Sequence, residues 1–221
     1  MNELCTSTWF QRSSALALAA LLGACSTPAL NRDRHGPSDV EGYIESLESP
    51  ERRAELEPER AVAELALSPS AWVADLGCGP GVFTLAFARA LPQGVVFAVD
   101  IEPRQLDRLR EHVRSEQLEN VVPVLASVDT PHLPPGKFDL IFIGETYHHF
   151  EDRVVYMRAL RRALRSGGRL AVLESKPGRG KHKVELAPGE MEDELRAAGW
   201  QLETRFDSHP EYDFTVWSPA S

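Results

Sequence analysis

The feature that most constrains the fold is an apolar strand pattern that runs directly into three closely spaced glycines. Residues 72–76 read WVADL, and glycines follow at positions 77, 79 and 81. Glycine adopts positive φ easily and lets the backbone approach a ligand, so the pattern predicts a tight turn from a strand into a helix. The free N–H groups at the start of that helix favour a polar ligand. The segment therefore predicts a nucleotide-type cofactor site; an ordinary strand-to-helix turn is the alternative.

The spacing of the glycines discriminates between cofactors. Residues 77–81 read GxGxG, whereas the dinucleotide fingerprint GxGxxG requires a glycine at position 82, where this chain has Val82. A pyrophosphate-binding site is therefore disfavoured. Asp75 before the turn, the GxGxG turn itself and Asp100 at the end of the next apolar run together resemble the first two motifs of class I S-adenosylmethionine (SAM)-dependent methyltransferases.

The resemblance covers roughly residues 40–218 and implies SAM as the cofactor. It implies that Asp75 helps to hold the methionine ammonium group, that Asp100 accepts both ribose hydroxyls and that Ile101 packs on adenine. Many family members place an Asp against the adenine amino group where this chain has Ser127, followed by Val128 with its backbone N–H; a simple loop is the alternative there. The expected cofactor-binding residues are Asp75, Gly77, Cys78, Gly79, Gly81, Asp100, Ile101, Ser127 and Val128.

Strand and helix patterns alternate along most of the chain. Strands are predicted at 72–76, 95–100, 121–125, 138–143 and 169–174, and helices at 81–91, 103–115, 151–165 and 188–198. Near-continuous apolar strands in such alternation indicate a parallel sheet covered on both faces, and the closely spaced runs 200–206 and 212–217 predict an antiparallel hairpin. We expect an α/β, Rossmann-like doubly wound, mostly parallel seven-stranded sheet with helices on both faces. The resemblance implies the strand order 3-2-1-4-5-7-6.

Ahead of this pattern, residues 40–47 and 61–67 have helical spacing and predict an N-terminal helical cap, with Pro50 and Pro58 as breakers between them. Farther along, Arg158, Arg161, Arg162 and Arg165 recur at helical spacing and predict a solvated helix face.

The segment after the fourth strand, GETYHHF at 144–150, resembles the His-His-aromatic run of small-molecule methyltransferases. Open α/β sheets bind ligands at the carboxyl ends of their strands, so Glu145, Tyr147 and His148 are the candidate catalytic residues on the acceptor side. His148 or Glu145 is the candidate general base for an acceptor that arrives protonated, with helix capping as the alternative. Glu174 and residues 176–183 are a candidate cover over the substrate mouth, or else a solvated loop.

A metal site is not expected. His148, His149 and Asp152 have suitable side chains, but neighbouring residues in the chain rarely converge on one ion.

The N-terminus predicts export. Arg12 precedes an apolar run at 15–22, which is about half a membrane span, and LGAC at 22–25 resembles a bacterial lipobox. The resemblance implies cleavage before Cys25 and a lipid on its sulfur, and Ser26 favours the outer membrane. We therefore expect a lipoprotein signal peptide at 1–24, a tether at 25–39 and a methyltransferase domain at 40–221, lipid-anchored in the cell envelope on the periplasmic side. A mis-assigned start and a cytoplasmic protein are the alternative.

Charge and site together limit the partners. A net charge of -9 disfavours nucleic acid, which requires clustered Lys and Arg. We expect methyl transfer to a small-molecule or lipid acceptor, with membrane contact through Cys25. A SAM-binding protein without turnover is the alternative, and an NAD-dependent oxidoreductase is a more distant one. An exported enzyme would also have to find SAM outside the cytoplasm.

Overall fold

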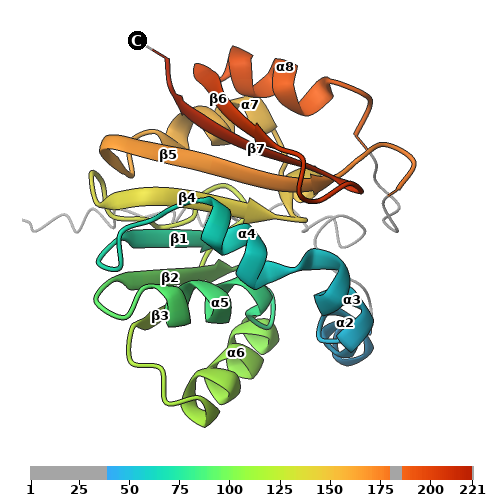
Figure 1. The fold of residues 1–221 in the computed structure, drawn as a ribbon, viewed down its shortest axis with the longest axis vertical. Helices are drawn as coiled ribbons and strands as arrows, with labels where there is room; N and C mark the ends of the chain where they lie inside the picture. Colours follow the sequence, from blue (N-terminus) through green and yellow to red (C-terminus); the bar gives the residue numbers. More distant parts are fainter. Residues whose placement is uncertain (1–38, 180–185, 221) are drawn as a thin grey trace, which may run out of the picture. The chain divides into compact units, whose positions relative to one another are not determined.

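Within residues 39–179 and 186–220, which the computed structural model describes, seven strands form one sheet in the order β3-β2-β1-β4-β5-β7-β6. Five strands pair in parallel, and β7 pairs antiparallel with both β5 and β6. Figure 1 shows the strands stacked in this order, which confirms the predicted fold class. The strands are β1 (Trp72–Leu76), β2 (Val95–Asp100), β3 (Val121–Leu125), β4 (Phe138–Gly144), β5 (Leu164–Ser175), β6 (Trp200–Phe206) and β7 (Tyr212–Pro219).

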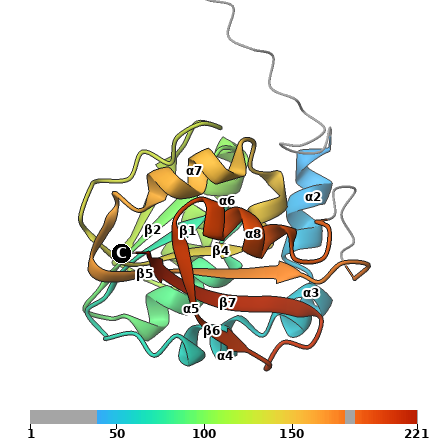
Figure 2. The same cartoon turned by 90° about the horizontal axis from the view of Figure 1, so that it is seen from above.

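Helices cover both faces of the sheet (Figure 2). Helices α4 (Pro58–Glu64) and α5 (Val82–Ala90) lie on one face, and α7 (Arg153–Leu160) and α8 (Glu190–Ala197) lie on the other. In β4, Leu140 and Phe142 pack toward α5, whereas Ile141 and Ile143 pack toward α7. Strands buried on both sides need the apolar runs that the sequence shows.

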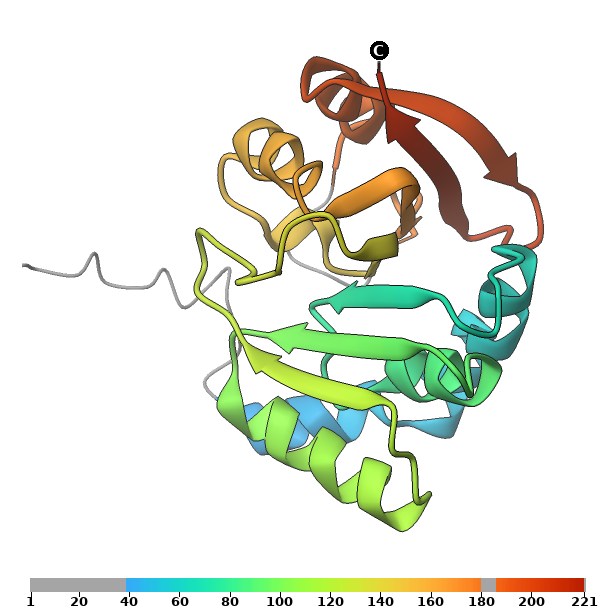
Figure 3. The same cartoon turned by 90° about the vertical axis from the view of Figure 1, so that its left-hand side faces the viewer.

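The β3 end of the sheet is covered by α6 (Pro103–Ser115), as Figure 3 shows. β3 is an edge strand and contains Pro123, which pairs with Ala98 of β2. Val96 N–H donates to Asn120 O and Ala126 N–H donates to Asp100 O. Because the direction of the backbone groups alternates along a strand, the nitrogen of Pro123 faces away from β2.

The N-terminal cap consists of α2 (Val40–Leu47), α3 (Pro50–Leu56) and α4, and α2 and α3 lie at the end of the sheet to which the parallel strands point (Figures 1 and 2). Pro50 and Pro58 separate the helices as predicted, but each also begins one, so the charged stretch between them is helical as well. The first position of a helix needs no N–H donor and suits the fixed φ of proline. Ser49 caps α3 by accepting a hydrogen bond from Arg52 N–H at 3.3 Å.

The basic run also differs from the prediction. α7 ends at Leu160 and β5 begins at Leu164, so Arg165 lies in a strand, where it pairs with Asp139. β4 pairs with β5 from Phe138–Leu164 onward, past a register shift, and this sheet pairing overrides the helical spacing of the sequence.

The predicted signal peptide, Cys25 and all but the last residue of the tether lie outside the described residues, as do residues 180–183 of the predicted cover. Among helices in the described ranges, none combines the length and the apolar character needed to cross a membrane.

Candidate active site

The loop between β1 and α5 has the conformation that its glycines predict. Gly77, Gly79 and Gly81 have φ of 70°, 54° and 104°, a region that other residues rarely adopt. The N–H groups of Gly77 and Cys78 donate to Val99 O at 2.8 and 3.1 Å, which holds the loop against the end of β2. A Cβ at Gly77 would overlap the Thr146 side chain, and a Cβ at Gly81 would overlap Leu109. Close packing against Thr146 therefore requires glycine at 77, whereas at 81 the φ of 104° favours glycine, because the Leu109 methyl is the end of a flexible side chain.

Asp100 joins the loop to β2. Its Oδ2 accepts from Gly79 N–H at 2.9 Å, and its Oδ1 accepts from Glu102 N–H at 2.9 Å. The side chain is buried, which raises the pKa of the carboxyl, although the backbone donors oppose this effect. Each oxygen of an ionised carboxylate has a second lone pair, so Asp100 keeps the capacity to accept two hydroxyls.

Asp75 lies deeper, at the end of β1, and is 2% exposed. Its Oδ2 accepts from Thr84 Oγ1 of α5 at 2.5 Å, a partner that the sequence analysis missed. Burial is the main cause that raises the pKa of Asp75 to about 7. The Cys78 thiol is also buried, and burial raises its pKa, so the residue contributes as backbone and not as a nucleophile.

Three further residues near the loop come from elements whose sequence patterns did not mark them. Gln105 of α6 is buried, its Oε1 has no hydrogen-bond partner among the described residues, and this atom lies 3.3 Å from the Cβ position of Gly79. Leu47 of α2 is 3.5 Å from the same position. Tyr43, also on α2, has a raised pKa, chiefly from burial, and Asp100 and Glu145 act on it as nearby negative charges. The sequence analysis did not single out Gln105, which reaches the loop through the packing of α6.

The described residues fit SAM. Glycine gives the loop its shape, Asp100 has accepting capacity, and the Gln105 oxygen is a buried acceptor facing the loop at Gly79. Buried polar atoms in proteins nearly always have partners, so an orphaned acceptor at this place indicates a ligand donor.

The predicted adenine-side residues follow β2 and β3. Ile101 is half-buried beside Asp100. Ala126 N–H donates to Asp100 O, which brings the start of the next loop to the same edge. Within that loop Ser127 is exposed, its hydroxyl contacts His132 Nε2 at 3.1 Å, and Val128 is half-buried.

On the acceptor side, Glu145 holds the ends of β4 and β5 together. Its Oε1 accepts from Ser175 N–H at 2.6 Å and its Oε2 accepts from Ser175 Oγ at 2.9 Å. The residue is buried and has φ of 54°, an uncommon conformation for a non-glycine residue. These contacts favour a positioning function for Glu145 over that of a general base.

Tyr147 does not face the acceptor side, and that expectation is corrected. The side chain is 0% exposed, its hydroxyl donates to Glu194 Oε2 of α8 at 3.0 Å, and Arg153 lies 5.9 Å from its ring centre. Burial and the neighbouring Glu194 raise its pKa far above the usual range. Tyr147 lies in the short 3-10 helix η1 (Tyr147–His149), whose tight turn points the side chain into the core.

His148 is 2% exposed, and its Nδ1 lies 2.5 Å from Oε1 of Glu174 at the end of β5. The second Glu174 oxygen accepts from Tyr147 N–H at 3.0 Å. A carboxylate at Nδ1 selects the Nδ1–H tautomer of a neutral histidine and makes Nε2 the proton-accepting nitrogen. Glu174 thus orients a candidate base, a role that the prediction of a cover did not include. The described ranges hold no group of three or more potential metal ligands.

Comparison with known proteins agrees with this geometry. Residues 73–168 match the family model of a methyltransferase domain. Methyltransferase GfsG of Streptomyces halstedii is 37% identical over 52% of this chain and 42% of its own length. The ubiquinone/menaquinone biosynthesis C-methyltransferase UbiE of Pasteurella multocida is 37% identical over 48% of this chain and 40% of its own length. The chain thus spans less than half the length of these curated relatives.

The crystal structure of a SAM-dependent methyltransferase from Aquifex aeolicus shares the fold, with a TM-score of 0.69 and 23% identity over 80% of this chain and 96% of that chain. Together the matches relate residues 73–168 to methyltransferase domains, and the Aquifex aeolicus structure shows that the fold is shared.

Proposed function

We propose that the protein transfers the methyl group of SAM to a small-molecule or lipid acceptor at the carboxyl ends of β4 and β5. The observation that carries the proposal is the glycine loop tied to Asp100, with the orphaned Gln105 oxygen facing it. When bound, SAM supplies an electrophilic methyl group on a sulfonium. Asp100 accepts hydroxyl donors, and Asp75 ionises beside an ammonium group because an opposite charge lowers the pKa of a carboxyl.

We propose that the His148–Glu174 pair removes the proton from the acceptor. For an acceptor with an O–H or N–H group, His148 Nε2 takes the proton and Glu174 stabilises the imidazolium that forms. Glu174 is a positioning residue because it acts through His148. A buried base also keeps water away from the reacting atoms.

The test measures SAM affinity by calorimetry and methyl transfer from labelled SAM to a panel of phenols, amines and quinols. Quinols belong in the panel because the P. multocida relative is named for ubiquinone and menaquinone biosynthesis. His148→Ala is expected to lower transfer by about 10²- to 10⁴-fold, the usual contribution of a general base, with SAM affinity changed only a few-fold. Tyr147→Phe is the matched control, since its hydroxyl faces Glu194, and should retain transfer.

Other outcomes contradict parts of the proposal. Full methyl transfer by His148→Ala would show that His148 is not the general base. Equal losses of SAM binding and methyl transfer would place His148 at the cofactor. SAM binding with no transfer to any acceptor favours a SAM-binding protein without turnover, and tighter binding of NAD than of SAM favours an oxidoreductase.

We also infer that the mature protein is anchored in the cell envelope through a lipid on Cys25. The apolar run at 15–22 and the sequence LGAC at 22–25 support this localisation. A lipid anchor would place the active site near membrane-dissolved acceptors, which is a second reason to include quinols.

A further inference from the structure

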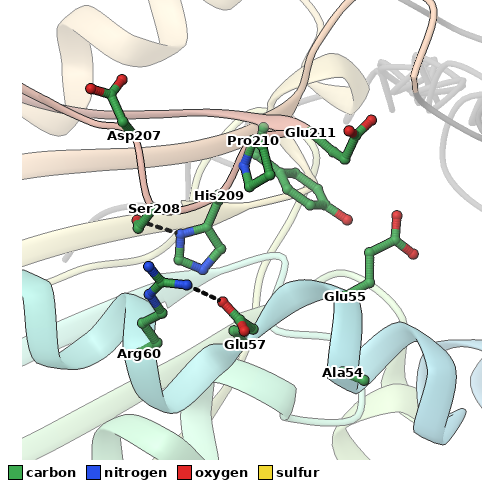
Figure 4. A pocket seen from close by; sticks show the side chains of 10 residues that line it. Ala54, Glu55, Glu57, Arg60, Asp207, Ser208, His209, Pro210 and Glu211 are labelled. Atoms are coloured by element: carbon green, nitrogen blue, oxygen red, sulfur yellow. Dashed lines mark hydrogen bonds and ion pairs between the residues drawn. The ribbon is translucent and has the colours of Figure 1, made fainter.

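A cavity lies between the α3–α4 junction and the loop that connects β6 to β7 (Figure 4). Its volume is about 550 Å³. The loop reaches the carboxyl end of β5, because Lys176 N–H donates to Glu211 O and Tyr212 pairs with Ser175. The cavity therefore lies at the same end of the sheet as Glu145, which binds Ser175.

His209 forms part of the cavity wall and belongs to a chain of hydrogen bonds. Ser208 Oγ donates to Glu64 Oε2 at 2.6 Å. Ser208 Oγ also lies 2.7 Å from His209 Nδ1. A serine hydroxyl has one proton, and an ionised carboxylate only accepts. Since that proton goes to Glu64, His209 must donate to Ser208 through Nδ1–H. In the neutral ring the lone pair is then on Nε2.

This Nε2 atom is a buried acceptor. His209 is 2% exposed, and Nε2 has no hydrogen-bond partner among the residues that the structure describes. In Figure 4 the ring nitrogen opposite the Ser208 contact points toward the space between Arg60 and Glu57. Leaving a buried acceptor without a donor is unfavourable, so a ligand that brings an N–H group to this place would gain affinity.

The charges around the cavity favour a cation. Four carboxylates line it, Glu55, Glu57, Asp207 and Glu211, against one guanidinium, Arg60. Glu57 pairs with Arg60 at 2.8 Å, and Glu211 pairs with Arg179 at 3.2 Å. Figure 4 shows Asp207 and Glu211 directed away from the cavity, which leaves Glu57 and Glu55 as the lining carboxylates that are not directed away from it. Glu64, which accepts from Ser208 Oγ, is a further carboxylate close to His209. Glu55 bonds to Tyr212, whose ring centre is 6.5 Å from that of His209.

We propose that this cavity is a binding site for a protonated primary amine. The ammonium group donates to His209 Nε2, Glu57 balances its charge, and its hydrocarbon chain packs on Tyr212. Arg60 pairs with Glu57 at 2.8 Å and lies 3.9 Å from Glu64, so the ligand has to displace it from Glu57; its side chain is 53% exposed and can turn toward solvent. The site does not depend on methyl transfer.

The experiment titrates the full-length protein with three probes at a pH where histidine is neutral and follows the ¹H–¹⁵N spectrum. The probes are n-butylammonium, tetramethylammonium, which has the charge without N–H, and n-butanol, which has a donor without the charge. We expect n-butylammonium to bind about tenfold more tightly than either of the others, with shifts at residues 207–212. Similar affinity for all three probes, or shifts elsewhere only, overturns the proposal.

Variants separate the contributions. Glu57→Gln should weaken the binding of n-butylammonium about tenfold, and Arg60→Gln should strengthen it. Asp207→Asn, which changes a carboxylate directed away from the cavity, should leave the affinity unchanged. His209→Phe should abolish the preference for n-butylammonium over tetramethylammonium. Long-range ¹⁵N spectra of the wild-type protein test the proton assignment without any variant. A ring protonated at Nε2 instead of Nδ1 overturns the proposal.

Discussion

Replacing Asp75 with Asn tests whether this carboxyl is held protonated in the folded protein. Burial raises its pKa from 3.8 to about 7. Between these values the unfolded chain releases the proton and the folded chain retains it. The contribution of Asp75 to the free energy of unfolding is fully present below its pKa in the unfolded chain. It is therefore lost as the pH rises through its folded-state pKa of about 7. Asn has no proton to lose there, so the variant should gain stability relative to the wild type as the pH rises.

The magnitude follows from the size of the shift. One pKa unit corresponds to about 1.4 kcal/mol, so ionising Asp75 in the folded protein costs roughly 4 kcal/mol above neutral pH. Asn still accepts from Thr84 through its carbonyl oxygen, but its buried amide N–H₂ costs about 1–3 kcal/mol at every pH. That cost is a constant offset. The difference in the free energy of unfolding between variant and wild type should therefore increase by roughly 2–3 kcal/mol between pH 5 and pH 8.

Urea unfolding of SAM-free protein, followed by circular dichroism at several pH values, measures this difference. Asp107→Asn, which removes an exposed carboxylate of α6, controls for the change in net charge. The reasoning is refuted if the Asp75→Asn difference does not vary with pH. The same variant should bind SAM more weakly than the wild type, because Asn has no negative charge to pair with the ammonium group of SAM.

Gly77→Ala should lower the free energy of unfolding by more than the roughly 1–2 kcal/mol of left-handed strain, because the new Cβ overlaps Thr146, and it should weaken SAM binding. Gly136→Ala is a matched control with φ of 66° and open space, and equal urea midpoints for the two variants would contradict the argument. Cys25→Ser, expressed in a diderm bacterium with labelled palmitate, should yield an unlabelled, uncleaved precursor. Soluble, cytoplasmic wild-type protein that retains Met1 would show that the export prediction is wrong.

The sheet was predictable because its strands are buried on both faces. The bounds of β1, β2 and β3 match the predicted ranges, since each is a short apolar run between turn residues. The glycine loop and Asp100 were also predictable, because their spacing along the chain determines where the backbone must turn. β5 was predicted too short because its first residues are polar, and only pairing with β4 makes them a strand.

The acceptor side was less predictable. Glu145, Tyr147 and His148 are neighbours in the sequence, but the turn directs Tyr147 to Glu194 and His148 to Glu174. Side-chain direction in a single 3-10 turn does not follow from residue spacing. Gln105 and Tyr43 reach the site only through the packing of α6 and α2, which no local pattern describes.

Pro123 in β3 limits how the molecule can associate with itself. An exposed sheet edge is a template on which another chain can add a strand, and β3 exposes Val122 and Leu125 at 39% and 55%. The nitrogen of Pro123 faces the open side of that edge and carries no hydrogen. A strand added at this edge would therefore find a carbonyl acceptor but no N–H donor at Pro123, in the middle of β3. The residue leaves the contact with β2 intact and disfavours edge-to-edge aggregation of the folded protein.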